Sequence, residues 1–295
     1  MLLTVSDIAA VGPNVWNGWK GALLRDLYLA TERYLMGEED ASISSKERAQ
    51  VRIESALKKA GNGECEMLAR VLAPLPWRVV LGLPPRHLLW AGRIMANAQG
   101  GVGVDALVDN ERGESLILVL APDRQGLFAD IAGVMAGHIN ILAAQAYALK
   151  DGRVLDVFHI QGGDGKPLSE QSDVSRLKQR IKQAAGGHVA VRTRKQKSHV
   201  LMQHVSVMAH PLPLASSRQT AIEVTAADRP GLLSLLAGKV AEAGFNVRGA
   251  NISTFGEKAV DVFFLTRRDG HILSKEETDV LCKQLSDAAQ LPKEV

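Results

Sequence analysis

Two stretches of this chain repeat the same pattern 105 positions apart, and this repeat restricts the possible folds more than any other feature. The register shifts by one residue around Asn140 and Asn246 and then recovers, as expected for one insertion and one compensating deletion. Such self-similarity indicates two copies of one structural unit. The repeated positions are Asp123, Arg124, Gly126 and Leu127, which recur as Asp228, Arg229, Gly231 and Leu232, and Asp156, Val157 and Phe158, which recur as Asp261, Val262 and Phe263.

Each copy begins with a strand-like run that leads directly into an Asp-Arg-x-Gly-Leu turn. An apolar stripe at helical spacing follows each turn, and two further strand-like runs then form a hairpin. Second helices are expected from N-caps at Ser169 and Ser274, the latter in a capping box with Glu277. The predicted strands are 115–121, 140–149, 153–160 and 189–193 in the first copy, and 220–226, 246–254 and 258–267 in the second.

This order of elements predicts an α+β fold of ferredoxin-like βαββαβ type, an antiparallel sheet with two helices on one face. A sheet of this kind leaves edge strands exposed, so we expect the modules to pair with each other, within one chain or between chains. The expected organisation is a helical segment at 1–110, a first module at 111–195, a basic linker at 196–219 and a second module at 220–295.

The turn between the first strand and the first helix of each module is the candidate ligand site. The first amides of a helix lack partners within it, and they attract a carboxylate. Asp228 can accept a hydrogen bond from an α-ammonium group, Pro230 suits the first helical turn, Gly231 lets a ligand approach, and Asn246 can donate and accept. A free amino acid fits this set. The residues expected to bind it are Asp228, Arg229, Pro230, Gly231, Leu232, Asn246 and Val247 in the second module, and Asp123, Arg124, Gly126, Leu127 and Asn140 in the first.

The second module is expected to hold the stronger site. In the first, Gln125 replaces the proline and His138 precedes the second strand. A purely structural alternative stays open, in which Asp228 caps the helix, Gly231 relieves crowding against the sheet and Asn246 closes a turn.

Composition argues against several other kinds of function. A formal net charge of +3 is too small to indicate nucleic-acid binding, and the basic run at 192–197 has no interleaved aromatic residues, so a charged linker is favoured over phosphate contact. Cys65 and Cys282 lie too far apart to suggest a disulfide framework or a zinc site. The absence of a basic leader and of a long apolar span predicts a cytoplasmic protein. The histidines interpreted as solvated side chains are His188, His199, His204 and His210.

Catalytic motifs are also absent from the sequence. No His-Asp dipeptide occurs, so a metal site of the HD phosphohydrolase type is not supported. The glycine-rich run at 100–105 lacks the Lys-Ser/Thr pair of a phosphate loop and is interpreted as a flexible loop.

The first third of the chain is expected to be helical without a fold of its own. Apolar residues at helical spacing predict a helix at 13–37, and a capping box of Ser44 and Glu47 predicts a second. Further helices are expected around Leu68 and at 84–95. Such helices need a surface to cover their apolar faces.

The same residues carry a resemblance to a known family. With the strand, the Asp-Arg-x-Gly-Leu turn and the Asn-hydrophobic start of the next strand present twice, both modules resemble ACT domains. The stretches LLTVSDIAAVGPNVWNGWKGALLRDLYLATERYL, LPPRHLLWAGRI and TAIEVTAADRPGLLSLLAGKVAEAGFNVRGANISTFGEKAVDVFFLTRRDG extend the likeness to almost the whole chain. It resembles the C-terminal part of the bifunctional PII uridylyltransferase/uridylyl-removing enzyme.

This resemblance implies a regulatory portion that senses glutamine, in an enzyme that adds UMP to the PII signalling protein and removes it. The catalytic nucleotidyltransferase and HD domains, with the Mg²⁺ they use, would lie outside this chain, and the opening helices would be the end of the HD domain. No cofactor is expected in the chain itself. The alternative is a stand-alone pair of ACT domains that binds a partner and no metabolite.

Overall fold

The structure is a computed structural model that describes residues 44–61, 63–98, 101–136, 138–187, 205–213, 219–255 and 257–290, together with Leu24, Tyr28 and Thr31. The helix predicted at 13–37 falls almost wholly outside these residues. The predicted strand at 189–193, the basic run at 192–197 and three of the four histidines noted above fall outside them entirely.

Four helices precede the modules in the described part of the chain. The predicted capping box at the start of α3 is confirmed, because the Glu47 amide donates to Ser44 Oγ at 3.3 Å and the Ser44 amide donates to Glu47 Oε2 at 2.7 Å. Pro85 begins α6, where its missing N–H removes no helical hydrogen bond. These helices are α3 (Ser45–Leu57), α4 (Cys65–Leu72), α5 (Trp77–Gly82) and α6 (Pro85–Asn97).

The two modules contain the strands and helices that the repeat predicts. Ser274 and Glu277 form the expected capping box of α10, whereas α8 begins after Glu170 instead of Ser169 and has no side-chain cap among the described residues. The first module contains β2 (Glu114–Pro122), α7 (Leu127–Met135), β3 (Ile139–Ala148), β4 (Arg153–Gly162) and α8 (Gln171–Ala185). The second contains β6 (Thr220–Ala227), α9 (Leu232–Glu242), β7 (Asn246–Phe255), β8 (Lys258–Thr266) and α10 (Lys275–Ala289).

Each module also has an edge strand at a position that differs from the prediction. β1 (Gly103–Asp109) pairs with β2, and β5 (Met208–Leu212) pairs with β6, both antiparallel. β1 lies in the expected helical segment and takes up part of the glycine-rich run interpreted as a loop, and β5 lies in the expected linker. The α+β class is confirmed, but the described elements of each module run ββαββα. The segment before each module therefore fills the edge position beside its first strand.

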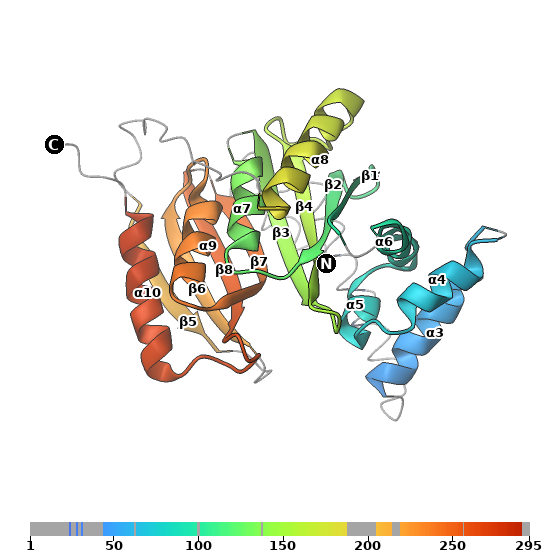
Figure 1. Ribbon diagram of the computed structural model, residues 1–295. Coiled ribbons are helices and arrows are strands. Elements are labelled where there is room, and N and C mark those ends of the chain that lie inside the picture. The colour runs from blue at the N-terminus through green and yellow to red at the C-terminus, as the bar shows by residue number, and fades with distance from the viewer. Residues whose placement is uncertain are drawn as a thin grey trace.

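The two modules join into one eight-stranded sheet of order β1-β2-β4-β3-β7-β8-β6-β5 (Figure 1). At the seam, β3 pairs antiparallel with β7, with Ala144 opposite Ala250 and Gln145 opposite Gly249. A Cβ atom added at Gly249 would lie 3.1 Å from the Ala144 carbonyl oxygen, so this position favours glycine. The predicted side-by-side pairing of the modules is thus confirmed within one chain.

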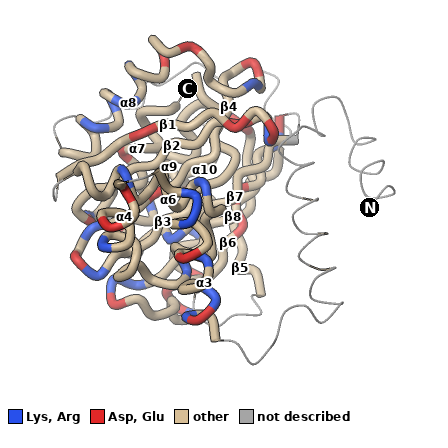
Figure 2. The backbone as a smooth tube through the Cα atoms, turned by 90° about the vertical axis from the view of Figure 1, so that its right-hand side faces the viewer, with Lys and Arg blue, Asp and Glu red and all other residues tan. Residues whose placement is uncertain are grey.

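Helices cover one face of the sheet in both modules and the opposite face in the first module. α7, α8, α9 and α10 lie along one face, and α3 to α6 pack against the opposite face beside β2 and β4 (Figure 1). Alternation along β2 explains both contacts, since Ile117 and Val119 face the first set of helices while Leu116 and Leu118 face the second. Charged residues gather on the helices and loops around the sheet (Figure 2).

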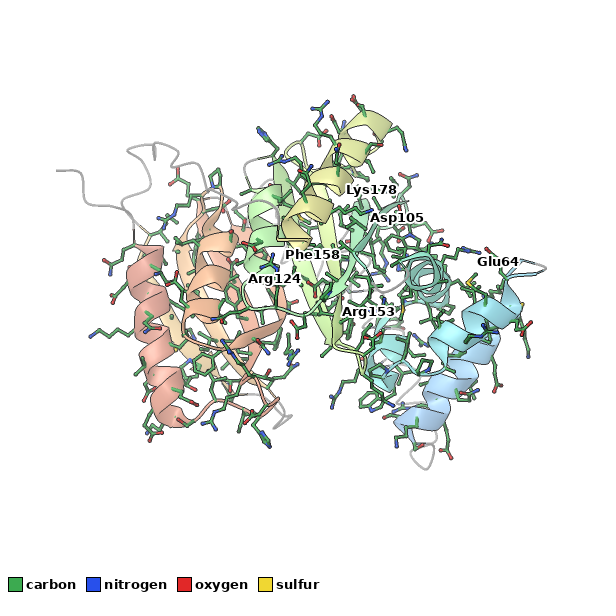
Figure 3. All side chains as sticks on the ribbon, in the orientation of Figure 1. Glu64, Asp105, Arg124, Arg153, Phe158 and Lys178 are labelled. Atoms are coloured by element: carbon green, nitrogen blue, oxygen red, sulfur yellow. The ribbon has the colours of Figure 1, made fainter. Side chains whose placement is uncertain are left out.

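Asp105 of β1 fixes the helical segment to the first module. Its carboxylate accepts a hydrogen bond from Trp90 Nε1 of α6 at 2.8 Å and pairs with Lys178 Nζ of α8 at 2.5 Å (Figure 3). These interactions lower the pKa of Asp105 in spite of the opposing effect of burial.

Among the described residues, no helix combines the length and the apolar character needed to cross a membrane.

Candidate ligand site

The turn before the first helix has the same geometry in both modules. Gly126 and Gly231 occupy the N-cap positions of α7 and α9 with φ of +77° and +85°, in the left-handed region that favours glycine. No side chain in the described part of the chain caps either helix. The Leu127 and Leu232 amides donate to the Arg124 and Arg229 carbonyls, so the second and third amides of each helix are the ones that remain available to an anion.

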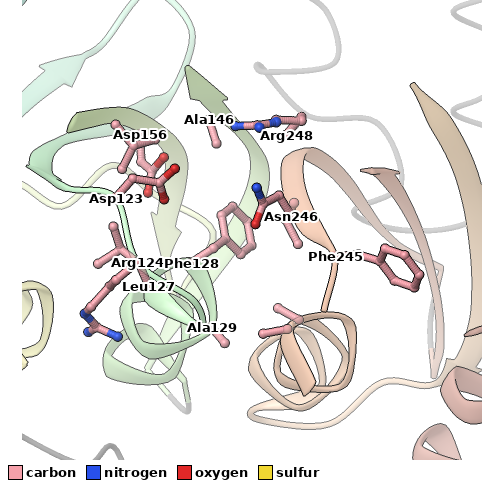
Figure 4. A pocket seen from close by; sticks show the side chains of 15 residues that line it. Asp123, Arg124, Leu127, Phe128, Ala129, Ala146, Asp156, Phe245, Asn246 and Arg248 are labelled. Atoms are coloured by element: carbon pink, nitrogen blue, oxygen red, sulfur yellow. The ribbon is translucent and has the colours of Figure 1, made fainter. Parts of the chain in front are cut away.

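The turn arginines have a structural role in both modules. Arg124 Nη2 donates to the Ala184 carbonyl at the end of α8 at 2.7 Å, and Arg229 Nη2 donates to the Ala288 carbonyl at the end of α10 at 3.1 Å. Arg124 also pairs with Asp130 at 2.7 Å. Each guanidinium thus satisfies the carboxyl end of the second helix of its own module. The Arg124 guanidinium points away from the cavity described next (Figure 4).

A cavity of about 40 Å³ lies between the turn of the first module and the start of β7 in the second (Figure 4). It is large enough for a few water molecules. Asp156, noted above only as a repeated position, and Arg248 also line it. Six predicted site residues line the cavity: Asp123, Arg124, Gly126, Leu127, Asn246 and Val247.

The other six predicted residues do not line this cavity. In the second module, the Asp228 carboxylate accepts hydrogen bonds from the Arg229 amide and the Thr254 side chain, while burial raises its pKa. In the first module, Asn140 Nδ2 donates to the Gly162 carbonyl at 3.2 Å. The second turn was expected to form the stronger site. In the structure, however, the cavity lies beside the first turn and combines parts of both modules. The residues outside it are Asp228, Arg229, Pro230, Gly231, Leu232 and Asn140.

Asp156 is the most unusual group in the cavity. Its side chain lies on β4 facing the turn, the residue is 2% exposed, and Oδ1 has no hydrogen-bond partner among the described residues. Burial, reinforced by the negative charge of Asp123 and opposed by Arg248, raises the pKa of Asp156 to about 8. The repeat could have revealed this residue, because both copies keep a carboxylate within an otherwise apolar strand.

The equivalent residue in the second module is Asp261. It is also 2% exposed, and its Oδ1 likewise has no hydrogen-bond partner within the described residues. Burial and the neighbouring Asp228 raise its pKa to about 7. The two modules therefore share a pair of adjacent carboxyl groups, one in the turn and one on the facing strand.

Arg248 has no counterpart of the same charge in the other half of the molecule. It lies at a bulge in β7, between Val247 and Gly249, and its Nε donates to Thr266 Oγ1 at 3.0 Å. The corresponding bulge in β3 places Leu142 at the equivalent position. A bulge redirects a side chain, and here it directs Arg248 toward the cavity.

Gln125 closes one side of the seam. Its Nε2 donates to the Ala241 carbonyl of α9, and its Oε1 accepts from Arg268 of the second module. Ser234 Oγ of α9 adds a hydrogen bond to the Ala129 carbonyl of α7 at 2.9 Å. These contacts hold the modules together beside the cavity.

A larger and more open groove of about 690 Å³ lies between the end of α9 and the start of α10. Two of its charged groups are paired with each other, since Arg267 Nη2 contacts Glu277 at 2.6 Å, and Glu277 also completes the capping box of α10. The smaller cavity holds the unpaired buried carboxyl group and is the better candidate site.

Among the described residues, no cluster of three His, Cys, Asp or Glu side chains could hold a metal ion.

Comparison with known proteins agrees with this architecture. Residues 220–283 match the ACT domain family. The first module repeats the elements of the second, so the fold is that of two ACT-type modules joined edge to edge by β3 and β7.

Two relatives extend the similarity to almost the whole chain. It is 32% identical over 291 residues to the bifunctional uridylyltransferase/uridylyl-removing enzyme of Phenylobacterium zucineum, covering 93% of this chain and 30% of that protein. It is 34% identical over 300 residues to the enzyme of the same name from Novosphingobium aromaticivorans, covering 98% and 32%. The chain is thus a homologue of part of these bifunctional enzymes and spans about a third of their length.

Proposed function

We propose that this chain is the regulatory, amino-acid-sensing portion of a PII uridylyltransferase/uridylyl-removing enzyme in nitrogen regulation, with glutamine as its ligand. The observation that supports this most is the cavity at the seam, which takes lining residues from both modules and contains uncapped helix amides and an unpaired carboxyl group. The choice of glutamine rests on the resemblance to the family, because no residue in the cavity selects a side-chain amide.

Binding at this position would change the relation between the modules. The cavity is too small for a whole amino acid, so glutamine would have to separate the α7 turn from the start of β7. The contacts of Gln125 with Ala241 and Arg268 are those that such an opening would break. Coupling of ~1 to 3 kcal/mol between two sites is usual for allosteric proteins.

The catalytic parts of the proposed enzyme would be separate from the residues of this chain. The nucleotidyltransferase and HD domains would carry out uridylylation and its reversal with Mg²⁺, the PII signalling protein would be the protein substrate, and all would act in the cytoplasm. The α3 to α6 segment, which packs against the first module, would connect the HD domain to the sensor.

Isothermal titration calorimetry with glutamine, glutamate and alanine tests this function. We expect heat of binding with glutamine and at least ~tenfold weaker binding of the other two, equivalent to ~1.4 kcal/mol. A folded protein that gives no heat with glutamine would contradict the proposal.

A second candidate function is a pair of ACT domains that binds a protein partner and no metabolite. The small volume of the cavity and the contacts of Gln125 across the seam favour it, since they describe a closed junction. The same titration separates the two, because a closed junction would not respond to glutamine.

A further inference from the structure

Asp156 lies outside the turn that the repeat identified, yet its buried carboxyl group lines the cavity without a hydrogen-bond partner at Oδ1 in the described part of the chain. A buried carboxyl group without partners is costly, and most native proteins satisfy such groups. An incoming positive group that donates hydrogen bonds would satisfy this one.

The charges around the cavity are arranged on two sides. Asp123 and Asp156 lie next to each other in the first module, and Arg248 extends from the second module over Ala146 (Figure 4). Arg124 is committed to Ala184 and Asp130. The cavity therefore offers two carboxyl groups on one side and a guanidinium on the other, which complements a zwitterion.

The opposite end of the seam lacks this arrangement. The carboxyl groups of Asp228 and Asp261 are adjacent there as well, but Asp228 already accepts a hydrogen bond from Thr254. Leu142 stands at the bulge position that Arg248 takes in the other half. The two halves thus share the carboxyl pair and differ in the cation.

Building on the proposed function, we propose that Asp156 binds the α-ammonium group of the amino acid, while Arg248 and the amides of Phe128 and Ala129 at the start of α7 bind its α-carboxylate. The site then requires a free ammonium group, and the equivalent pair at Asp228 and Asp261 does not form a second site. Asp156 thus determines which class of metabolite the sensor accepts.

The same arrangement couples binding to pH. Burial and Asp123 raise the pKa of Asp156 to about 8, so its carboxyl group is mainly protonated at neutral pH. Asp123 and Arg248 are the charged groups that face it. When the ammonium group arrives, the Asp156 proton leaves to solvent and the carboxylate accepts the N–H donors. Binding should therefore release up to one proton and strengthen as pH rises from about 6 to about 8, by at most ~tenfold per pH unit.

Calorimetry of the full chain with glutamine, at several pH values and in phosphate and Tris buffers, measures both affinity and proton release. Asp156→Asn should bind at least ~tenfold more weakly and lose the pH dependence, whereas Asp261→Asn, a matched change on the equivalent strand, should keep both. Circular dichroism confirms that each variant is folded. Glutaramate, which replaces the ammonium group of glutamine by hydrogen, should bind the unaltered protein at least ~tenfold more weakly, a comparison that needs no variant.

The outcomes separate this inference from the proposed function. If the unaltered protein binds glutamine but Asp156→Asn or glutaramate changes nothing, the role of Asp156 is wrong and glutamine sensing still stands. If Asp261→Asn has the same effect as Asp156→Asn, the site is not confined to one end of the seam. If the unaltered protein binds no glutamine, both proposals fail.

Discussion

The carboxyl groups of Asp156 and Asp261 occupy one position in each module, within strands whose neighbours are apolar. Water would hold such groups ionised at neutral pH, whereas burial favours the neutral form. The free energy of unfolding should therefore depend on pH through these two residues, whether or not a ligand binds.

Replacing Asp156 by asparagine tests this dependence. The pKa of about 8 in the folded state is above the ordinary value of 3.8, so the native state retains a proton that the unfolded chain loses. The contribution of Asp156 to stability is thus complete below about pH 4 and is lost as pH rises through about 8. At pH 8 the free energy of unfolding of Asp156→Asn should exceed that of the unaltered chain by ~1 to 3 kcal/mol. At pH 4 the two values should differ little.

Urea unfolding monitored by circular dichroism at pH 4, 6 and 8 would measure this effect. Asp261→Asn should behave similarly, with its gain levelling off near pH 7, because the pKa of Asp261 is raised to about 7. Equal stability of Asp156→Asn and the unaltered chain at pH 8 would show that the carboxyl group is not buried as described.

Residue patterns predicted the turns better than the site. Gly126 and Gly231 were expected at the start of the first helices, and both adopt the left-handed conformation there. Asp156 was not predicted as a site residue, since a single carboxylate in an apolar strand does not reveal which group it faces. That information comes from the packing of the strand against the turn.

At the scale of elements, the seam between β3 and β7 is the junction on which the site depends. Gly249→Val should destabilise the protein by ~1 to 3 kcal/mol, because the new Cβ would press on the Ala144 carbonyl oxygen. The matched control is Gly238→Ala in α9, where a Cβ meets nothing within 4 Å. This control should gain ~0.5 to 1 kcal/mol from helix propensity.

Thermal and urea unfolding of the two glycine variants would decide this point. Lower stability of Gly249→Val together with higher stability of Gly238→Ala would support the close approach of β3 and β7 at the seam. Similar values for both variants would mean that the two strands do not approach closely at Gly249.

The elements that sequence reasoning predicted correctly are those with a local signal. Such signals are the capping boxes at Ser44 and Ser274 and the apolar stripes of α7 and α9. Each depends only on residues one or two helical turns apart. β1 and β5 were not predicted, because the first begins in a glycine-rich run and the second is short and contains Pro211. Their conformation depends on pairing with β2 and β6, which the local sequence does not reveal.

At the scale of the whole molecule, the candidate site combines residues of both modules. A separate site was expected in each copy, whereas the antiparallel seam brings the turn of the first copy to the start of β7 in the second. The repeat indicated both turns, and the exposed edge strands predicted the pairing of the modules. Neither could predict that the first turn lies beside the start of β7, because that depends on the register of the seam.

The contacts of Gln125 should oppose ligand binding. Gln125→Ala removes its hydrogen bonds to Ala241 and Arg268 and should therefore ease the opening of the cavity, increasing the affinity for glutamine by ~2-fold to ~10-fold. Pro230→Ala, at the equivalent position of the second turn, should leave the affinity unchanged. Calorimetry on both variants gives the comparison, and a weaker affinity of Gln125→Ala would contradict an opening at this position.

Hydrogen exchange of backbone amides, measured with and without saturating glutamine, tests the central claim most directly, because it locates the ligand. We predict slower exchange on binding at 127–129 in α7 and at 246–248 in β7, with little change at the equivalent amides of 232–234 and 140–142. Protection at the second set in place of the first, or binding without protection at either, would contradict a single site at the seam beside α7.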